Sequence, residues 1–165
     1  MIVAMFTLLT RRPLLAPCVL AAAALAVAMI SQYGFGTHAC HLCLLQRYPY
    51  VVVIMLCIAG IIVRYRSLIL IGCALAFFTT AGIGAYHVAV EHGWVEASDA
   101  CAASTTATGS LEELKQQIMN APLVSCADVG ASFAGISMPL WNVIYGVMAA
   151  AFTLYIRKIH YVQNR

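Results

Sequence analysis

Charged side chains are scarce in this sequence: Asp, Glu, Lys and Arg together make up 9% of its 165 residues. Soluble domains carry about 25% charged residues, so this chain lacks the side chains that would cover an ordinary water-facing surface. It also lacks a basic tract, which argues against nucleic acid as a partner. Hydrophobic residues replace the missing charge, at 63% of the chain. The composition therefore predicts an integral membrane protein embedded in a lipid bilayer.

Four apolar stretches are candidates for membrane-spanning helices. A helix rises 1.5 Å per residue, so about 20 residues cross a hydrocarbon layer of about 30 Å. The predicted spans are residues 14–33, 48–63, 68–90 and 140–156, of which the second is short. The expected fold is an all-α membrane protein, a four-helix transmembrane bundle that forms a single domain over residues 1–165.

The flanking charges predict which ends of the spans lie in the cytoplasm, because cytoplasmic loops are enriched in Lys and Arg. One side carries Arg11, Arg12, Arg64, Arg66, Arg157, Lys158 and Arg165. The other side has only Arg47 and Lys115 as basic residues, and all six acidic residues lie there. We therefore expect both termini inside (N-in/C-in) and two outer loops, residues 34–47 and 91–139.

The first span has an alternative interpretation as a cleaved signal peptide, with Ala26-Val27-Ala28 as the cleavage site. The apolar core of a signal peptide usually has about 7–15 residues. This stretch is longer and continues through Met29 and Ile30. We therefore expect a helix that stays in the mature protein.

The second outer loop contains one helix signal. Ser110 and Glu113 have the spacing of a capping box, in which each side chain bonds the other residue's backbone N–H. Leu111, Leu114 and Ile118 follow at helical spacing. This pattern predicts a short amphipathic helix, which lies either on the outer membrane surface or on the protein's own loop.

Seven cysteines are present, an odd number, so at least one has no internal partner. Cys18, Cys57 and Cys73 fall inside predicted spans, where a cysteine behaves as a small, inert hydrophobe. The outer side carries the other four: Cys40, Cys43, Cys101 and Cys126. Thiols outside an inner membrane meet an oxidising environment, so these four are expected to form two pairs. Three pairings are possible, and the simplest joins the two neighbours Cys40 and Cys43.

The segment Cys40-His41-Leu42-Cys43 predicts redox chemistry more strongly than a structural role. A ring this short constrains little chain, so its value lies in sulfur exchange. Arg47 follows Cys43 by four residues, and a helix would bring its guanidinium to the thiol's face, where a cation favours the thiolate. If the second span begins near Pro49, both residues precede the helix and only their proximity in sequence remains.

A metal site is the alternative for the same segment. Zinc and copper accept thiolate and imidazole ligands. The candidate ligands are His38, Cys40, His41 and Cys43. Both histidines also suit a polar loop at a membrane surface, so we predict no metal.

These motifs together resemble the DsbB family, the disulfide bond formation proteins B of bacterial inner membranes. The resemblance rests on Cys-x-x-Cys followed by Arg47, on a cysteine pair in each outer loop, on Glu91-His92, and on Met138-Pro139-Leu140-Trp141. It extends over essentially the whole chain. The family usually has Pro before its first cysteine, where Ala39 stands here. A vitamin K epoxide reductase-like enzyme is a second possibility, but that family's redox motif comes late in its chain.

The resemblance implies an enzyme that reoxidises a DsbA-like periplasmic thioredoxin-fold oxidase and passes the electrons to a membrane quinone, ubiquinone or menaquinone. Cys101–Cys126 would be the disulfide that the partner attacks at Cys101. Cys40–Cys43 would reoxidise it through a transient Cys40–Cys126 link. Cys43 would meet the quinone, with Arg47 stabilising the thiolate. His92 would lie close by as a proton donor. The outer loops would then be periplasmic.

Overall fold

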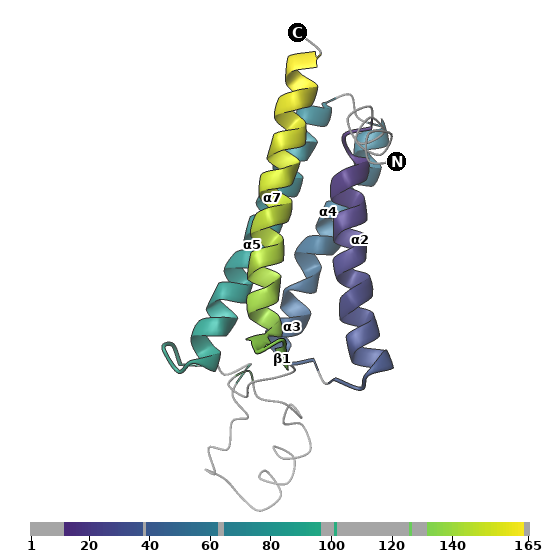
Figure 1. Cartoon of the computed structure of the whole chain (residues 1–165). Helices are drawn as coiled ribbons and strands as arrows, with labels where there is room; N and C mark the ends of the chain where they lie inside the picture. The colour runs from purple at the N-terminus through teal and green to yellow at the C-terminus, as the bar shows by residue number, and fades with distance from the viewer. Residues whose placement is uncertain are drawn as a thin grey trace, which may run out of the picture.

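The computed structural model describes residues 12–37, 39–62, 65–96, 101, 126 and 132–163. In this part of the chain, long helices dominate and one small hairpin directly precedes the last helix (Figure 1). The elements in chain order are α2 (Leu15–Met29), the π-helix η1 (Ile30–Gly34), α3 (His41–Leu45), α4 (Arg47–Ile62), α5 (Arg66–Glu91), β1 (Ser132–Phe133), β2 (Ile136–Ser137) and α7 (Met138–Gln163).

Four helical segments are long and apolar enough to cross a membrane, which confirms the predicted all-α membrane fold with four spans. They are Leu15–Gly34, His41–Ile62, Arg66–Glu91 and Met138–Val162. The second segment combines α3 and α4, so it begins before the stretch 48–63 expected from the sequence. The last helix continues to Gln163, past the expected end at residue 156. The amphipathic helix expected at Ser110 lies outside the described residues.

Local sequence determines where α5 ends and α7 begins. Gly93 has a φ of +68°, its N–H bonds the carbonyl of Val90, and the N–H of Trp94 bonds the carbonyl of Ala89. This pair of bonds around a left-handed glycine is a Schellman motif, which ends a helix. Before α7, β1 and β2 pair antiparallel around a two-residue turn with positive φ at Ala134 and Gly135.

Small residues bring α5 and α7 close together along their length. A Cβ at Gly146 would lie 2.9 Å from the carbonyl oxygen of Phe77, and one at Gly84 would lie 3.2 Å from that of Pro139. Lipid tails are as apolar as the side chains, so the hydrophobic effect does not drive helices together within a membrane. Membrane helices associate instead by close packing at small residues such as these. The main apolar core consists of Ala21, Tyr50, Val53, Cys57, Cys73, Phe77, Ala149 and Ala150.

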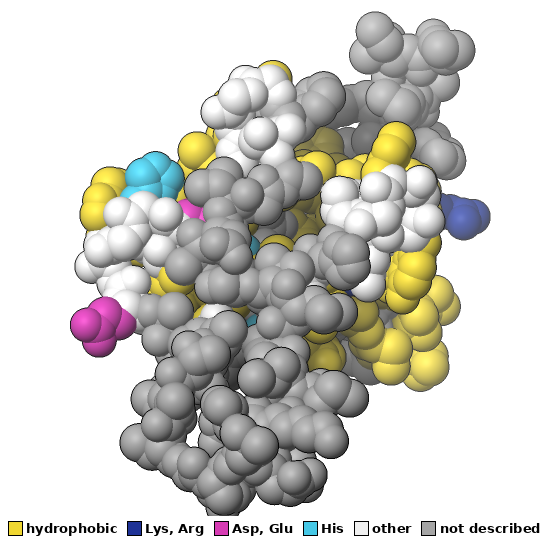
Figure 2. Space-filling model, turned by 90° about the horizontal axis from the view of Figure 1, so that it is seen from below, with side chains coloured by type: hydrophobic (Ala, Val, Ile, Leu, Met, Phe, Trp, Pro, Cys, Tyr) yellow, Lys and Arg dark blue, Asp and Glu magenta, His cyan; other side chains and the backbone are white. Residues whose placement is uncertain are grey.

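The two ends of the bundle differ in their chemistry. α2 begins and α7 ends at the same end (Figure 1), where the Arg157 side chain donates from Nε to Ser67 Oγ at 3.0 Å. The other end, called the cysteine end below, carries Cys40, Cys101 and Cys126 in one buried cluster. Seen from the cysteine end, hydrophobic side chains reach the rim, and only isolated charged side chains are visible among them (Figure 2).

Candidate functional site

Cys40 and Cys43 lie at the start of α3. Cys40 is the N-cap residue, with extended backbone, and its sulfur accepts a hydrogen bond from the backbone N–H of Cys43 at 3.3 Å. This cap folds the chain back so that the Cys40 thiol also donates to the Cys43 sulfur, with the two sulfurs 2.8 Å apart. A disulfide needs sulfurs about 2.05 Å apart. The pair can therefore close or open with only a small rotation of the side chains.

The four cysteines of the outer loops gather in one place. Cys40, Cys101 and Cys126 are 6%, 1% and 1% exposed, and they pack in one apolar cluster with Leu42 and Val90. Cys43 is half-buried and packs against the same cluster. The backbone N–H of Cys126 donates to the Cys101 carbonyl at 3.3 Å, although 25 positions separate them in sequence. Both predicted pairs thus meet at the cysteine end, where thiol–disulfide exchange can pass electrons from one pair to the other.

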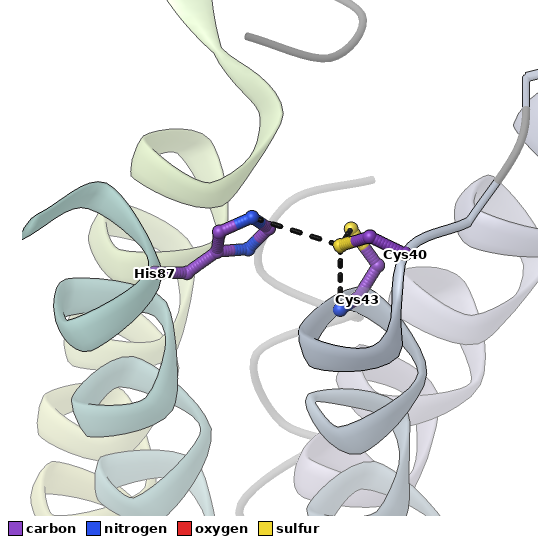
Figure 3. Close-up of side chains that lie close together, drawn as sticks. All are labelled: Cys40, Cys43 and His87. Carbon is purple, nitrogen blue, oxygen red and sulfur yellow. Dashed lines mark hydrogen bonds between the residues drawn. The ribbon is translucent and has the colours of Figure 1, made fainter. Parts of the chain in front are cut away.

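His87 of α5 points at this cysteine pair from across the bundle (Figure 3). Its Nε2 atom lies 3.6 Å from Cys40 Sγ, and its Nδ1 atom lies 3.3 Å from the side-chain nitrogen of Gln46. The ring is 2% exposed. The sequence analysis did not single out His87. A signal was available, because an ionisable residue inside a membrane span is a candidate functional residue by default.

The surroundings of Cys40 hold it in the protonated form. Its pKa is raised to about 12, chiefly because its thiol donates a hydrogen bond to Cys43 and also because burial disfavours a charge. The contact with His87 acts in the opposite direction and lowers the pKa. A thiolate accepts a hydrogen bond better than a thiol does, so the bond from Cys40 favours negative charge on Cys43. The two sulfurs are therefore not equivalent.

Arg47 is anchored to the first span. Its guanidinium donates from Nη1 to Gln32 Oε1 at 2.6 Å and from Nη2 to the Ala28 carbonyl at 3.5 Å. Cys43 lies in α3 and Arg47 begins α4, with Gln46 between the two helices. Arg47 therefore follows Cys43 by four positions in the sequence, but its guanidinium hydrogen-bonds to residues of α2 and η1.

The other predicted histidines lie at the surface or outside the described residues. His92 is exposed at the end of α5, where its Nδ1 atom lies 2.9 Å from the Val88 carbonyl and its ring lies 5.2 Å from that of Trp94. His41 is exposed, and His38 is outside the described residues. The structure thus brings His87, and not His41, to the cysteine pair.

Cys40, Cys43 and His87 have the ligand types of a soft metal site. Their candidate ligand atoms all lie within 4.8 Å of one another. The alternative metal site from the sequence used His38 and His41 instead of His87. The same three side chains also suit thiol chemistry, because a histidine beside a cysteine pair can exchange protons with it.

A known protein family matches most of the chain. The family model described as "Disulfide bond formation protein DsbB" matches residues 10–156. The chain belongs to the DsbB family. The matched range includes both cysteine pairs, Arg47, His87 and His92. Membership in the DsbB family makes the chain a membrane protein of disulfide-bond formation, and it favours thiol oxidoreductase chemistry over a metal site.

One relative is similar to the chain over most of its length. The chain is 28% identical to the uncharacterized protein RP370 of Rickettsia prowazekii (strain Madrid E) over 132 residues. This match covers 78% of the present chain and 77% of the relative. No solved structure matches the chain.

Proposed function

We propose that this DsbB-family protein is a quinone-dependent protein-thiol oxidoreductase that reoxidises a DsbA-like periplasmic partner of thioredoxin fold. The observation that carries the proposal is the buried cluster of Cys40, Cys101 and Cys126 with Cys43 packed against it, which gathers the two predicted pairs in one place. Two pairs in contact can exchange disulfides within one chain. A structural disulfide would need no second pair beside it.

The electrons enter at the Cys101–Cys126 disulfide. A thiolate of the reduced partner attacks Cys101 Sγ, forms a mixed disulfide and releases Cys126 as a thiolate. Cys126 attacks Cys40 Sγ and releases Cys43 as a thiolate. The partner's second thiolate breaks the mixed disulfide, and the freed Cys101 re-forms its bond with Cys126 and releases Cys40. The partner has then lost two electrons, and the Cys40–Cys43 pair has gained them together with two protons.

The residues around Cys43 fit a membrane quinone. When bound, a quinone supplies an acceptor for two electrons and two protons. Cys43 and Arg47 would hold it: the sulfur is half-buried, and the guanidinium offers several N–H donors. Leu44 and Tyr48, which are exposed beside them, give this end of the span an apolar surface that suits an isoprenoid. His92 at the outer end of α5 would exchange protons with water.

The proposed location is the bacterial inner membrane, with the cysteine end in the periplasm. Disulfides persist in the periplasm and are rare in the cytosol. The opposite end of the bundle carries Arg66 at the start of α5, and Arg157 beside Ser67. Basic residues at that end support a cytoplasmic orientation for it.

The decisive experiment mixes the purified protein with a reduced DsbA-like oxidase and either ubiquinone or menaquinone. Without quinone the protein should oxidise at most about one equivalent of the partner. With quinone we expect continued loss of the partner's thiols, with one quinone reduced per further disulfide formed. Replacing Cys43 with Ala should stop multiple turnovers. If the parent protein fails to oxidise the partner in the presence of ubiquinone and also in the presence of menaquinone, the proposed function is wrong.

A further inference from the structure

We propose that His87 is a catalytic acid–base residue of the Cys40–Cys43 pair, and that Gln46 positions its ring. In this proposal His87 takes the proton from Cys40 when the disulfide closes and returns a proton when the disulfide opens. The proposal rests on the proposed function, because it concerns the step in which the reduced pair becomes a disulfide again. The residue expected from the sequence to donate protons was His92, five positions later in the chain.

The chemistry of Cys40 creates the need for such a residue. To form a bond with Cys43, the Cys40 sulfur must lose its proton, yet a thiol of pKa about 12 is a thiolate in only about one molecule in 10⁵ at pH 7. The residue Cys40 is 6% exposed, so bulk water has little access to its sulfur. Cys43 already accepts the hydrogen bond of this thiol and must give up electrons in the same step. His87 Nε2, 3.6 Å away, is the ring nitrogen that meets Cys40 from another helix.

The ring of His87 is held by a hydrogen-bonded network that crosses three helices. Gln46 Nε2 lies 3.3 Å from His87 Nδ1, and the Gln46 carbonyl accepts from Thr80 Oγ1 at 3.0 Å. Asn142 of α7 donates to Thr80 Oγ1 at 3.1 Å, and the Tyr50 hydroxyl donates to Asn142 Oδ1. Polar groups in an apolar bundle are costly unless they are paired. This chain of partners therefore resists any movement of the ring away from Cys40.

Gln46 suits a histidine that changes its protonation state. Its amide carries both donors and an acceptor. When the amide N–H donates to Nδ1, the neutral ring carries its proton on Nε2 and can donate to a Cys40 thiolate. When the amide is turned round, its oxygen accepts from Nδ1–H, and Nε2 offers a lone pair to the Cys40 thiol.

The proton and electron balance of the closing step is then complete. The Cys40 proton moves to Nε2, the ring becomes an imidazolium, and the sulfur bonds to Cys43 while two electrons pass to the quinone acceptor. The imidazolium then releases its proton, which together with a second proton from the dithiol balances the reduction of the acceptor. Among the described residues, the titratable groups near His87 or its partners are Cys40 and Cys43 of the pair, Cys101 and Cys126 in the cluster with Cys40, Glu91 one turn further along α5, and Tyr50 of the network.

The test measures Cys40 itself and does not depend on quinone. In a Cys43→Ala background, Cys40 is alkylated with iodoacetamide across pH 5 to 10, and mass spectrometry follows the product. With His87 present, its ring can take the proton from the Cys40 thiol, so we expect faster alkylation of Cys40 at pH 7. His87→Gln should slow alkylation at pH 7 by about tenfold or more, since acid–base residues typically contribute larger factors to a reaction. His160→Gln, a histidine at the opposite end of α7, serves as the matched control and should leave the profile unchanged.

Two further measurements separate this proposal from the proposed function. In the full enzyme, His87→Gln should slow quinone-dependent turnover by about 10²-fold, while the first exchange between the partner and Cys101 keeps its parent rate. Gln46→Ala retains the imidazole and should give a smaller loss, so it replaces His87→Gln if that variant fails to fold. An unchanged alkylation profile in these variants overturns the role of His87, whatever the turnover assay shows. A parent protein that never oxidises the partner overturns the proposed function instead.

Discussion

Arg47 donates a hydrogen bond to Gln32 across 2.6 Å, and this bond joins the start of α4 to the π-helix at the end of α2. π-Helical turns are rare and are frequently found at functional sites. A charged side chain at membrane depth needs polar partners, which Gln32 and the Ala28 carbonyl supply here. The guanidinium is therefore fixed at the mouth of the second span before any ligand arrives.

The first prediction concerns this fixed cation. Arg47→Ala should raise the apparent KM for quinone by about 10-fold to 100-fold, because a hydrogen bond to a charged group contributes about 1.5–3 kcal/mol. Exchange between the partner and Cys101 should keep its parent rate. Gln32→Ala should give a smaller increase, since the guanidinium stays but loses its anchor. Steady-state assays with quinone as the varied substrate measure both effects, and equal KM values in Arg47→Ala and parent would remove Arg47 from quinone binding.

The second prediction concerns the order of the two cysteine pairs. A partner that lacks its second cysteine should accumulate a mixed disulfide with Cys101 of the parent protein, because no second thiolate remains on the partner to break it. Cys101→Ala should give no such adduct. Non-reducing gel electrophoresis followed by peptide mapping identifies the sulfur that is joined to the partner. An adduct at Cys40 in both the parent protein and Cys101→Ala would reverse the proposed order.

Much of the fold could be predicted from the sequence, because membrane spans are a local property. About twenty apolar residues suffice to identify a span, and flanking basic residues predict its orientation. The Cys-x-x-Cys motif at 40–43 is also local, and its N-cap geometry follows directly from the helix that starts at His41. The helix expected around Ser110 stays a prediction, because it lies outside the described residues.

The partners of His87 and Arg47 could not be predicted, because they depend on contacts between distant segments. His87 meets Cys40 across 47 positions of sequence, so the apolar stretch around the histidine carries no information about the pair. The i, i+4 spacing of Cys43 and Arg47 predicted a shared helical face. The helical segment His41–Ile62 contains both residues, with a turn at Gln46, and the Arg47 guanidinium hydrogen-bonds to Gln32 of the first span.

The third prediction follows from the raised pKa of Cys40. In the fully reduced protein its thiol should remain protonated up to about pH 12, so the rate of alkylation should increase about tenfold per pH unit between pH 8 and 11. The hydrogen bond to Cys43 is the largest cause of the raised pKa. Cys43→Ala should therefore make the pH–rate curve of Cys40 level off at a lower pH. Superimposable curves in the two proteins would show that Cys43 does not control the Cys40 proton.

The fourth prediction concerns the close contact of α5 and α7. A Cβ at Gly146 would meet the Phe77 carbonyl at 2.9 Å and the Ala81 side chain at 3.1 Å. Backbone cannot yield locally, so Gly146→Ala should push the helices apart and lower the free energy of unfolding by about 1–3 kcal/mol. Gly82→Ala is the matched control on α5, because nothing lies within 4 Å of its Cβ position. Unfolding in a titration with denaturing detergent should show the first variant destabilised and the second unchanged or slightly stabilised.

The fifth prediction concerns the cysteines inside the bundle. Cys57 of α4 and Cys73 of α5 are buried in the main core with their sulfurs 3.9 Å apart, and Cys18 packs beside them. A serine hydroxyl in a helix can bond the carbonyl four residues earlier, as Thr153 does with the Ala149 carbonyl at 2.7 Å. Serine should therefore be tolerated at all three positions, with nearly parental turnover.

The core cysteines and the cysteines of the outer loops belong to different apolar clusters. The Cys57 and Cys73 sulfurs belong to the main apolar core, whereas Cys40 belongs to the separate cluster that holds both outer pairs. If electrons pass only between the outer pairs, the thiols in the main core take no part in electron transfer. A combined Cys18→Ser, Cys57→Ser and Cys73→Ser protein should thus oxidise its partner at close to the parent rate, and its circular dichroism spectrum should match. A folded but inactive triple variant would mean that a third sulfur pair within the membrane takes part in electron transfer.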